Sequence, residues 1–457
     1  MKIKIPFHYS FFISIAAIYI LVLRLPPDDL LRDVIAYKYN YDYNSLYIYA
    51  PLLSKYNQYI AFDILLAYLI KLGLSPVLTV SIIQILCFVL YSILTIKILQ
   101  KYINDKTILI LLITLCLNPL IIGRINSGRP EIILTCWSMY ILIIHNKNII
   151  YKIIGLLIGC LLIPTYWLAI LYTPVILLMT RNLIKNVFIM IIFIIINVLF
   201  WQIYSKGLWI HNFSLIKECL MNRIPDMPQA ENSSFFISLL CWQFALFFSI
   251  FVSVVALWMK GQSKISQLIK HKVILIYLVI ITYFIFAFNM VRYVDIIQPL
   301  ILLLLIKILK TRELDHVNLM YQKLEHGLSS KTSITNIVYI VSVSVFFNSL
   351  QAIFNEVKEI PQFKNIPENS RVLTADVAKY FIPFFNQKNI KIALSMEVGA
   401  NESWVQEQSV NILNKHKLDC SKIKGNFDYV VEKYLNYTPD CLVLTDVSGA
   451  YRLWKVK

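Results

Sequence analysis

Long apolar runs recur along most of this chain, and they constrain its fold more than any other feature. Each run has about 18 residues or more, which is enough for a helix to cross a bilayer. Of the 457 residues, 58% are hydrophobic and only 15% are charged, whereas a soluble domain carries about 25% charged residues. A soluble fold would have too little polar surface to cover so many buried helices. The sequence therefore predicts an α-helical polytopic membrane protein.

The positions of the apolar runs predict about 11 transmembrane helices. No A-x-A-like cleavage site follows the first run, so we interpret it as a retained anchor and not as a cleaved signal. The fifth and sixth runs are short and are separated by Pro164 and Thr165, which predicts either two half-depth helices or one kinked segment. The limits of the runs are 7–25, 76–98, 106–122, 131–145, 150–163, 166–180, 187–204, 236–259, 273–290, 295–309 and 334–354.

The charges between the runs predict the orientation of the chain. With the N-terminus in the cytoplasm, every predicted cytoplasmic loop is basic, while the opposite loops contain most of the acids. Membrane topology thus accounts for much of the net charge of +17, which does not indicate a nucleic-acid partner. An odd number of spans places the C-terminal tail outside. We expect a transmembrane domain over 1–354, with an outer loop over 26–75, and a small extracytoplasmic domain over 355–457.

The tail has a different composition from the rest of the chain, with charges of both signs and short β-like runs. Strands are predicted at 371–375, 391–395, 441–445 and 451–456, and a helix around 404–415. These elements predict a small α/β domain. Cys420 and Cys441 both lie in this polar tail, and they form the only plausible disulfide pair among the eight cysteines. Several other cysteines fall inside apolar runs, where they act as small apolar residues.

A group of acidic and basic residues follows the first apolar run. Pro26 and Pro27 end that run and favour the start of a new helix, so Asp28 and Asp29 fall in its first turn, where the helix dipole stabilises anions. At helical spacing Asp28 shares a face with Arg32. The group could cap the helix, but its place at the membrane exit favours a functional site.

The rest of the first outer loop is rich in tyrosine. Residues 37–49 carry a tyrosine at nearly every second position. Two interpretations are open: an interfacial aromatic belt, or a platform that stacks on a sugar or a headgroup. The segment 59–72 is too short for a comfortable span, and it predicts an amphipathic helix that lies in the membrane interface.

The second predicted outer loop, residues 123–131, breaks the charge rule because it places Arg124 and Arg129 outside. Glycines in this loop allow a ligand to approach the backbone closely, and arginines bind phosphate with forked geometry. Snorkelling of the arginines to headgroups is the structural alternative, but the pattern favours a phosphate site. Glu131 begins the next span and is expected to face the same cavity.

Arg292 and Tyr293 lie in another short outer turn. An isolated arginine at the membrane edge indicates a functional site. The alternative is a simple ion pair between Arg292 and Asp295, three residues further on. Both interpretations remain open from the sequence.

Taken together, these features resemble the GT-C superfamily of polyprenyl-phosphate-sugar-dependent membrane glycosyltransferases. The resemblance rests on the acidic pair in the first outer loop, the Gly-Arg-Pro-Glu of the second, the Arg-Tyr before a late span and the C-terminal outer domain. It implies that Asp28 or Asp29 is the catalytic base. It also implies that Arg124, Arg129 or Arg292 binds the phosphate. Whether a divalent metal ion lies between carboxylate and phosphate is left open, and no other cofactor is expected.

The resemblance implies a transfer of sugar from a polyprenyl-phosphate donor to a glycan, lipid or protein acceptor. The expected site of action is the periplasmic face of a bacterial inner membrane, among membrane lipids. A single displacement with inversion is expected, because nothing in the sequence indicates a covalent intermediate. Two alternatives are an O-antigen-type polymerase or ligase, and a lipid flippase or transporter. A transporter should place its polar residues along a path through the bundle.

Overall fold

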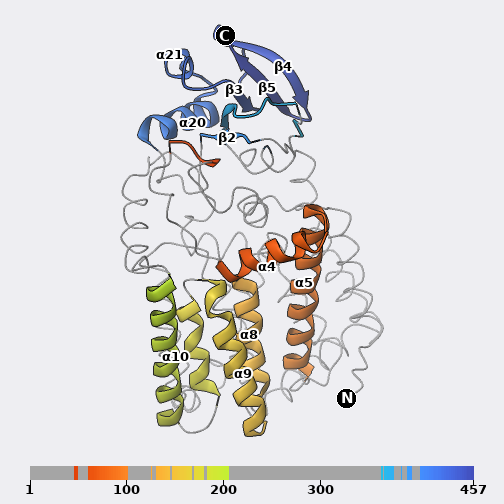
Figure 1. Cartoon of the computed structure of the whole chain (residues 1–457), viewed down its shortest axis with the longest axis vertical. Helices are drawn as coiled ribbons and strands as arrows, with labels where there is room; N and C mark the ends of the chain where they lie inside the picture. Colours follow the sequence, from red (N-terminus) through yellow and green to blue (C-terminus); the bar gives the residue numbers. More distant parts are fainter. Residues whose placement is uncertain are drawn as a thin grey trace, which may run out of the picture.

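The structure is a computed structural model of the whole chain. The residues that it describes are 46–49, 60–100, 125, 130–144, 147–166, 169–179, 183–204, 362–363, 365–374, 382, 389–393 and 402–457. They form an apolar helical part and a mixed α/β part, which lie toward opposite ends of the long axis of the molecule (Figure 1). The predicted spans at 7–25, 106–122, 236–259, 273–290, 295–309 and 334–354 lie outside the described residues.

Within the described residues, four apolar helices run along the helical part. They are α5 (Pro76–Gln100), α8 (Glu131–Ile144), α9 (Ile149–Leu162) and α10 (Leu183–Tyr204). Within the described residues, two stretches are long and apolar enough to cross a membrane, Pro76–Gln100 and Ile184–Ile203. α9 and α10 expose rows of isoleucine and leucine side chains along their outer faces. Such faces suit contact with lipid hydrocarbon.

The short fifth and sixth runs form separate helices and not one kinked helix. α9 ends at Leu162 and is followed by the 3₁₀ turn η2 (Ile163–Thr165), which has Pro164 in its first turn. The backbone is extended at Tyr166, and a second 3₁₀ segment, η3, covers Ala169–Leu178. The structure therefore contains two helical segments with a break between them, and the depth of each in the membrane stays a prediction.

The connections between the helices fix which ends lie together. α4 (Ile60–Lys71) leads into the start of α5 and also contacts η2, so η2 and the end of α9 lie at the same end of the bundle as α4. α8 and α9 are antiparallel, because Trp137 approaches Gly159 while Ile144 approaches Gly155. The turns between α8 and α9 and between η3 and α10 therefore lie at the other end, away from the sheet (Figure 1).

α4 lies across the sheet-facing end of the bundle (Figure 1). Phe62 and Leu66 are buried, whereas Ile64 and Tyr68 are exposed. Apolar side chains on both faces suit a helix that packs on protein with one face and meets the membrane interface with the other. This agrees with the helix predicted at 59–72.

Within the described part of the tail, the α/β part is built around a five-stranded sheet with the order β2-β1-β3-β5-β4. β1 pairs in parallel with both β2 and β3, while β5 is antiparallel to β3 and to β4. The helices α20 (Ser403–Lys415) and α21 (Cys420–Ile423) follow β2 in the chain. The strands are β1 (Arg371–Thr374), β2 (Lys391–Ile392), β3 (Tyr429–Glu432), β4 (Leu442–Ser448) and β5 (Tyr451–Val456).

The predicted disulfide is present and joins α21 to the residue before β4. Cys420 at the start of α21 is bonded to Cys441, the residue before β4. Cys441 belongs to the hydrophobic core, whose other members include Val405 of α20, Val430 of β3 and Trp454 of β5. The bond therefore fixes the helical layer to the sheet.

A piece of the first outer loop also joins this sheet. Residues Leu46–Tyr49, here called the docked segment, lie beside the edge strand β2. Tyr47 forms a parallel bridge with Ile392, and Ile48 and Tyr49 pack against the core of the α/β part. Neither interpretation of the tyrosine-rich loop predicted this contact. For Tyr47 and Tyr49, the structure replaces the membrane belt and the sugar platform with packing against protein.

Candidate functional site

Glu131 is the predicted site residue that the structure describes. Asp28, Asp29, Arg32, Arg124, Arg129, Arg292 and Tyr293 lie outside the described residues. Their roles remain predictions, and so does their convergence on one cavity.

Glu131 is the first residue of α8, and it is buried, with 5% of its surface exposed. The helix starts there because Pro130 cannot donate a backbone hydrogen bond but can accept one. Its carbonyl accepts hydrogen bonds from the backbone N–H groups of Ile133 at 3.0 Å and Leu134 at 3.4 Å. The N-terminal end of a helix favours a negative charge. A buried carboxylate at this end of the bundle is suited to orient a basic group of the preceding loop.

One face of α8 carries further buried polar residues after Glu131. Thr135 and Ser138 follow Glu131 at helical spacing, and both are buried. The Thr135 hydroxyl donates to the Glu131 carbonyl at 3.1 Å, so it is satisfied within its own helix. Hydroxyl groups of this kind are common where membrane helices pack closely.

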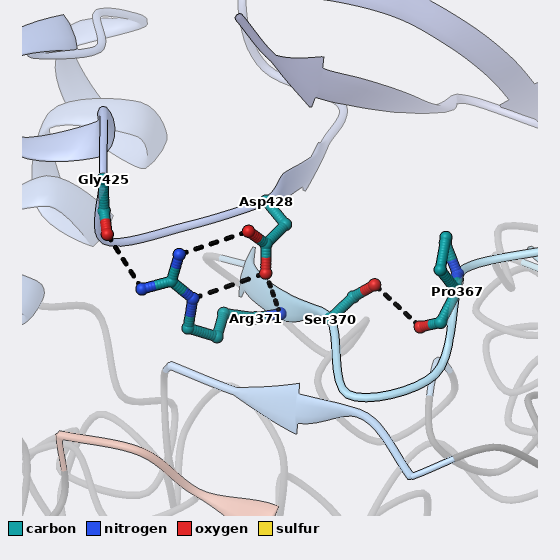
Figure 2. A network of polar contacts seen from close by, with 5 residues as sticks. All are labelled: Pro367, Ser370, Arg371, Gly425 and Asp428. Carbon is teal, nitrogen blue, oxygen red and sulfur yellow. Dashed lines mark hydrogen bonds and ion pairs between the residues drawn. The ribbon is translucent and has the colours of Figure 1, made fainter.

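A polar network near the sheet surrounds Arg371 and Asp428 (Figure 2). The Arg371 guanidinium donates to both carboxylate oxygens of Asp428, at 3.3 Å and 3.2 Å, and to the Gly425 carbonyl at 2.8 Å. The Arg371 backbone N–H also donates to Asp428, at 2.8 Å. Ser370 turns back to donate to the Pro367 carbonyl at 2.7 Å. The network joins the start of β1 to the turn before β3.

These contacts shift the pKa values of both partners. The hydrogen bond with Asp428 raises the pKa of Arg371, and an electrostatic interaction with Tyr49 adds to the rise. Partial burial alone raises the pKa of Asp428, but the hydrogen bonds from Arg371 outweigh it and lower that pKa. Because the guanidinium is occupied by protein acceptors, we interpret Arg371 as a structural residue and not as a phosphate ligand.

Glu432, at the end of β3, is a second buried carboxylate. One oxygen accepts hydrogen bonds from the backbone N–H groups of Tyr434 and Leu435, both at 2.6 Å. The other accepts from the Trp454 indole at 2.7 Å and lies 3.5 Å from the Arg452 guanidinium. These contacts use both oxygens, which assigns Glu432 to the fold. Glu432 was not predicted from the sequence. The local signal for a buried carboxylate is a glutamate at the end of a short apolar run.

Within the described ranges, no group of three or more His, Cys, Asp or Glu side chains is placed to hold a metal ion. The carboxylates expected to hold a divalent metal, Asp28 and Asp29, are outside those ranges. The binding of a divalent metal ion between carboxylate and phosphate therefore stays a prediction.

No protein-family model matches the sequence, and no curated protein matches it. Among solved structures, the chain is similar to the archaeal oligosaccharyltransferase AglB from Archaeoglobus fulgidus, solved in complex with an inhibitory peptide and a dolichol-phosphate. The match covers 93% of this chain and 69% of that chain, with a TM-score of 0.51 and 11% sequence identity. At this identity the likeness establishes the fold alone. The chain therefore shares the overall fold of that oligosaccharyltransferase, in agreement with the GT-C resemblance of the sequence.

Proposed function

We propose that this chain is an integral membrane glycosyltransferase that moves a sugar from a polyprenyl-phosphate-linked donor to an acceptor on the outer face of the membrane. The observation that carries the proposal is the fold, which matches that of an oligosaccharyltransferase over 93% of the chain. That transferase binds a dolichol-phosphate and a peptide in its solved structure. By analogy the donor here is lipid-linked, and the acceptor is a glycan, a lipid or a protein.

The proposed chemistry is a single displacement at headgroup depth. Asp28 or Asp29 abstracts a proton from the acceptor hydroxyl as the oxygen attacks the anomeric carbon, and the lipid phosphate departs with the bonding electrons. Two adjacent carboxylates repel each other, which favours a raised pKa in one of them and suits it to act as a base. Arg129, Arg124 and Arg292 are proposed to stabilise the charge that develops on the phosphate. Arg32 and Tyr293 are proposed to assist at the same site.

Glu131 fits this proposal as an orienting group. Its carboxylate is buried at the start of α8, two residues after Arg129. A buried carboxylate beside a basic loop can hold an arginine in one orientation through a charge-assisted hydrogen bond. We propose that Glu131 fixes Arg124 or Arg129 for phosphate binding.

The arrangement of charges supports an outer-face site. Lys97, Lys152 and Lys185 lie in terminal turns of α5, α9 and α10, at the end of the bundle away from the sheet. By the positive-inside rule this end is cytoplasmic. The disulfide between Cys420 and Cys441 belongs in an oxidising compartment such as the periplasm. We propose an inner-membrane protein with a cytoplasmic N-terminus and an outer α/β domain.

The same lysines favour the enzyme over the transporter alternative. A transporter places charged or broken helix segments near the middle of the membrane to bind its substrate. The break at η2 is one such segment, but η2 contacts α4 at the sheet-facing end of the bundle. In the described spans α5 and α10, Lys97 and Lys185 are the charged residues. Both lie near helix ends, where the membrane meets water, and not along a path through the bundle.

The deciding experiment replaces the proposed base. Asp28→Asn and Asp29→Asn keep the side-chain shape but remove the carboxylate, so at least one should lower transfer from a polyprenyl-phosphate sugar by a factor on the order of 100 or more. Asp42→Asn, in the same loop, is the matched control and should transfer at the wild-type rate. Wild-type rates in both Asp28→Asn and Asp29→Asn, with normal insertion, would remove the main support for the proposal.

The phosphate site is tested separately. Arg129→Ala and Arg292→Ala should weaken transition-state stabilisation by about 2–4 kcal/mol each. Arg→Lys at either position should rescue activity only in part, because the forked contact is lost. Normal turnover in both alanine variants at wild-type expression would reject these residues as phosphate ligands.

A further inference from the structure

The docked segment joins two regions that are far apart in the sequence. Tyr47 pairs with Ile392, so residues of the first outer loop extend the sheet beyond the edge strand β2. The Ile48 N–H donates to the Ile392 carbonyl at 2.9 Å, and the Glu402 N–H donates to the Tyr49 carbonyl at 2.8 Å. The segment is therefore held by backbone hydrogen bonds at β2 and just before α20.

Side-chain packing holds the segment more firmly than these bonds alone. Leu46 and Tyr47 are almost completely buried. The Tyr49 ring lies edge-on to Trp404, with centroids 5.0 Å apart, and edge-on to Phe427 at 5.9 Å. Aromatic pairs prefer this geometry. An electrostatic interaction with Tyr49 also adds to the raised pKa of Arg371, so the segment interacts with the arginine of Figure 2.

The backbone of Tyr49 has an unfavourable conformation. Its φ angle is 62°, in the left-handed region, which a bulky side chain rarely adopts. Such a conformation persists only where contacts with the surrounding structure enforce it. Residues with this conformation are concentrated at functional sites. Here the ring contacts with Trp404 and Phe427 and the hydrogen bond from Glu402 supply that constraint.

The docked segment belongs to the same predicted outer loop as Asp28 and Asp29. One end of that loop leaves the first predicted span, and the other leads into α4 at the sheet-facing end of the bundle. Fixing the loop to the α/β part between these ends restricts the positions that its carboxylates can adopt. Catalysis is sensitive to such restriction, because a displacement of about 1 Å can cost roughly 100-fold in rate.

We propose that the docked segment holds the first outer loop in its catalytic position and that Tyr49 is a positioning residue of the transferase. This inference rests on the proposed function. It gives the α/β part a role in the chemistry of the loop: loss of the Tyr49 ring should slow turnover with little effect on binding of the lipid donor.

The kinetic test compares three variants of the full-length protein. Tyr49→Ala removes the ring, Tyr49→Phe keeps the ring but loses the hydroxyl, and Tyr437→Ala removes a half-exposed tyrosine of the same α/β part that does not belong to the docked segment. We expect Tyr49→Ala to lower kcat about tenfold or more with KM for the polyprenyl-phosphate sugar changed less than about twofold. Tyr49→Phe and Tyr437→Ala should stay within about threefold of wild type.

Rescue by a cross-link separates positioning from a general loss of stability. Adjacent strands lie about 4.8 Å apart, which is within the range that a disulfide spans. Tyr47→Cys with Ile392→Cys, oxidised in the Tyr49→Ala background, should restore kcat to within about threefold of wild type. The single variants Tyr47→Cys and Ile392→Cys in that background should remain slow.

Limited trypsin cleavage at Lys38 and Lys55, mapped by mass spectrometry, tests the docking without any assay of transfer. Cleavage should be faster in Tyr49→Ala than in wild type, Tyr49→Phe or Tyr437→Ala. Unchanged cleavage and turnover in Tyr49→Ala would overturn the inference, as would faster cleavage with wild-type turnover, or slow turnover that the cross-link fails to rescue. A wild-type protein that transfers no sugar would refute the proposed function, and the cleavage comparison would still decide whether the docked segment holds the loop.

Discussion

Replacement of Gly159 by alanine should destabilise the helical part more than the same change at Gly155. The two glycines lie one turn apart on the face of α9 that packs against α8. A Cβ at Gly159 would lie 2.5 Å and 2.7 Å from two atoms of the Trp137 indole, and 2.8 Å from the Phe193 ring. A Cβ at Gly155 would instead meet the terminal methyl groups of Ile144 at 2.7 Å and Ile141 at 3.0 Å.

The difference between the two sites follows from how freely their neighbours can move. Trp137 stacks on Phe193, with centroids 5.4 Å apart, and its indole N–H donates to the Gly155 carbonyl at 2.8 Å. Relieving the clash at Gly159 therefore displaces a stacked ring and strains a buried hydrogen bond. Overpacking costs about 1–3 kcal/mol, and an interhelical hydrogen bond in a membrane is worth about 0.6–1.7 kcal/mol. We expect Gly159→Ala to cost about 2–4 kcal/mol, and Gly155→Ala about 1 kcal/mol, because a terminal methyl can rotate away.

The buried thiols Cys87 and Cys136 provide the assay, since both lie within the packed helices. A fluorogenic maleimide added to the detergent-solubilised protein reacts with them as the helices open on heating. Gly159→Ala should react at a clearly lower temperature than wild type, with Gly155→Ala between them. Trp137→Phe in the Gly159→Ala background should recover part of the loss, because the smaller ring makes room. Equal midpoints for the two alanine variants would refute this account of the packing.

Four further predictions concern the α/β part and the topology. Cys420→Ser with Cys441→Ser, which removes a bond between residues 21 positions apart, should lower the stability of the α/β part by about 3 kcal/mol in denaturant unfolding followed by tryptophan fluorescence. Glu432→Ala should cost about 3–5 kcal/mol in the same assay, because it leaves the Arg452 charge and the Trp454 indole without their partner. Asp428 has a lowered pKa, so its stabilisation is present above its ordinary pKa of about 4 and is lost as the pH falls through the lower, folded-state value; unfolding followed from pH 6 downward should show this loss in wild type and not in Asp428→Asn. Reporter fusions at Lys264 and Lys415 should lie on opposite sides of the membrane, and a shared side would contradict the predicted span count.

The elements that the sequence predicted well are those whose pattern is local. The apolar run at 76–98 corresponds to α5, and the helix expected around 404–415 corresponds to α20. The strands expected at 371–375 and 451–456 correspond to β1 and β5. In each case the signal lies in the composition of the segment itself, which is a long apolar run for α5 and a shorter run bounded by polar residues for the others. The pairing of Cys420 with Cys441 followed from location, because both cysteines lie in the polar tail.

The elements that the sequence did not predict depend on partners far along the chain. β3 has only four residues, Tyr429–Glu432, and its terminal glutamate argues against a buried strand until Arg452 and Trp454 are placed beside it. The docked segment has a repeating tyrosine pattern that suits several environments equally well. Its contact with β2 is a pairing of Tyr47 with Ile392, and no local signal specifies such a pairing. Of the candidate site, the structure places Glu131 at the start of α8, where the sequence expected it.

The docked segment also explains how so short an edge strand is maintained. β2 has only two residues, Lys391–Ile392, and an edge strand exposes backbone groups that must be paired or protected. The bridge from Tyr47 and the Ile48 N–H bond to Ile392 cover the outer side of β2. At the other edge, β4 is longer and its register with β5 shifts between Leu444 and Asp446. Such an irregularity twists an edge strand and discourages its pairing with a strand of another molecule. Within the described residues, the β2 edge is the edge that pairs with the first outer loop. We therefore expect a disturbance of that loop to reach the sheet through β2 and β1, and Arg371 at the start of β1 also interacts with Tyr49.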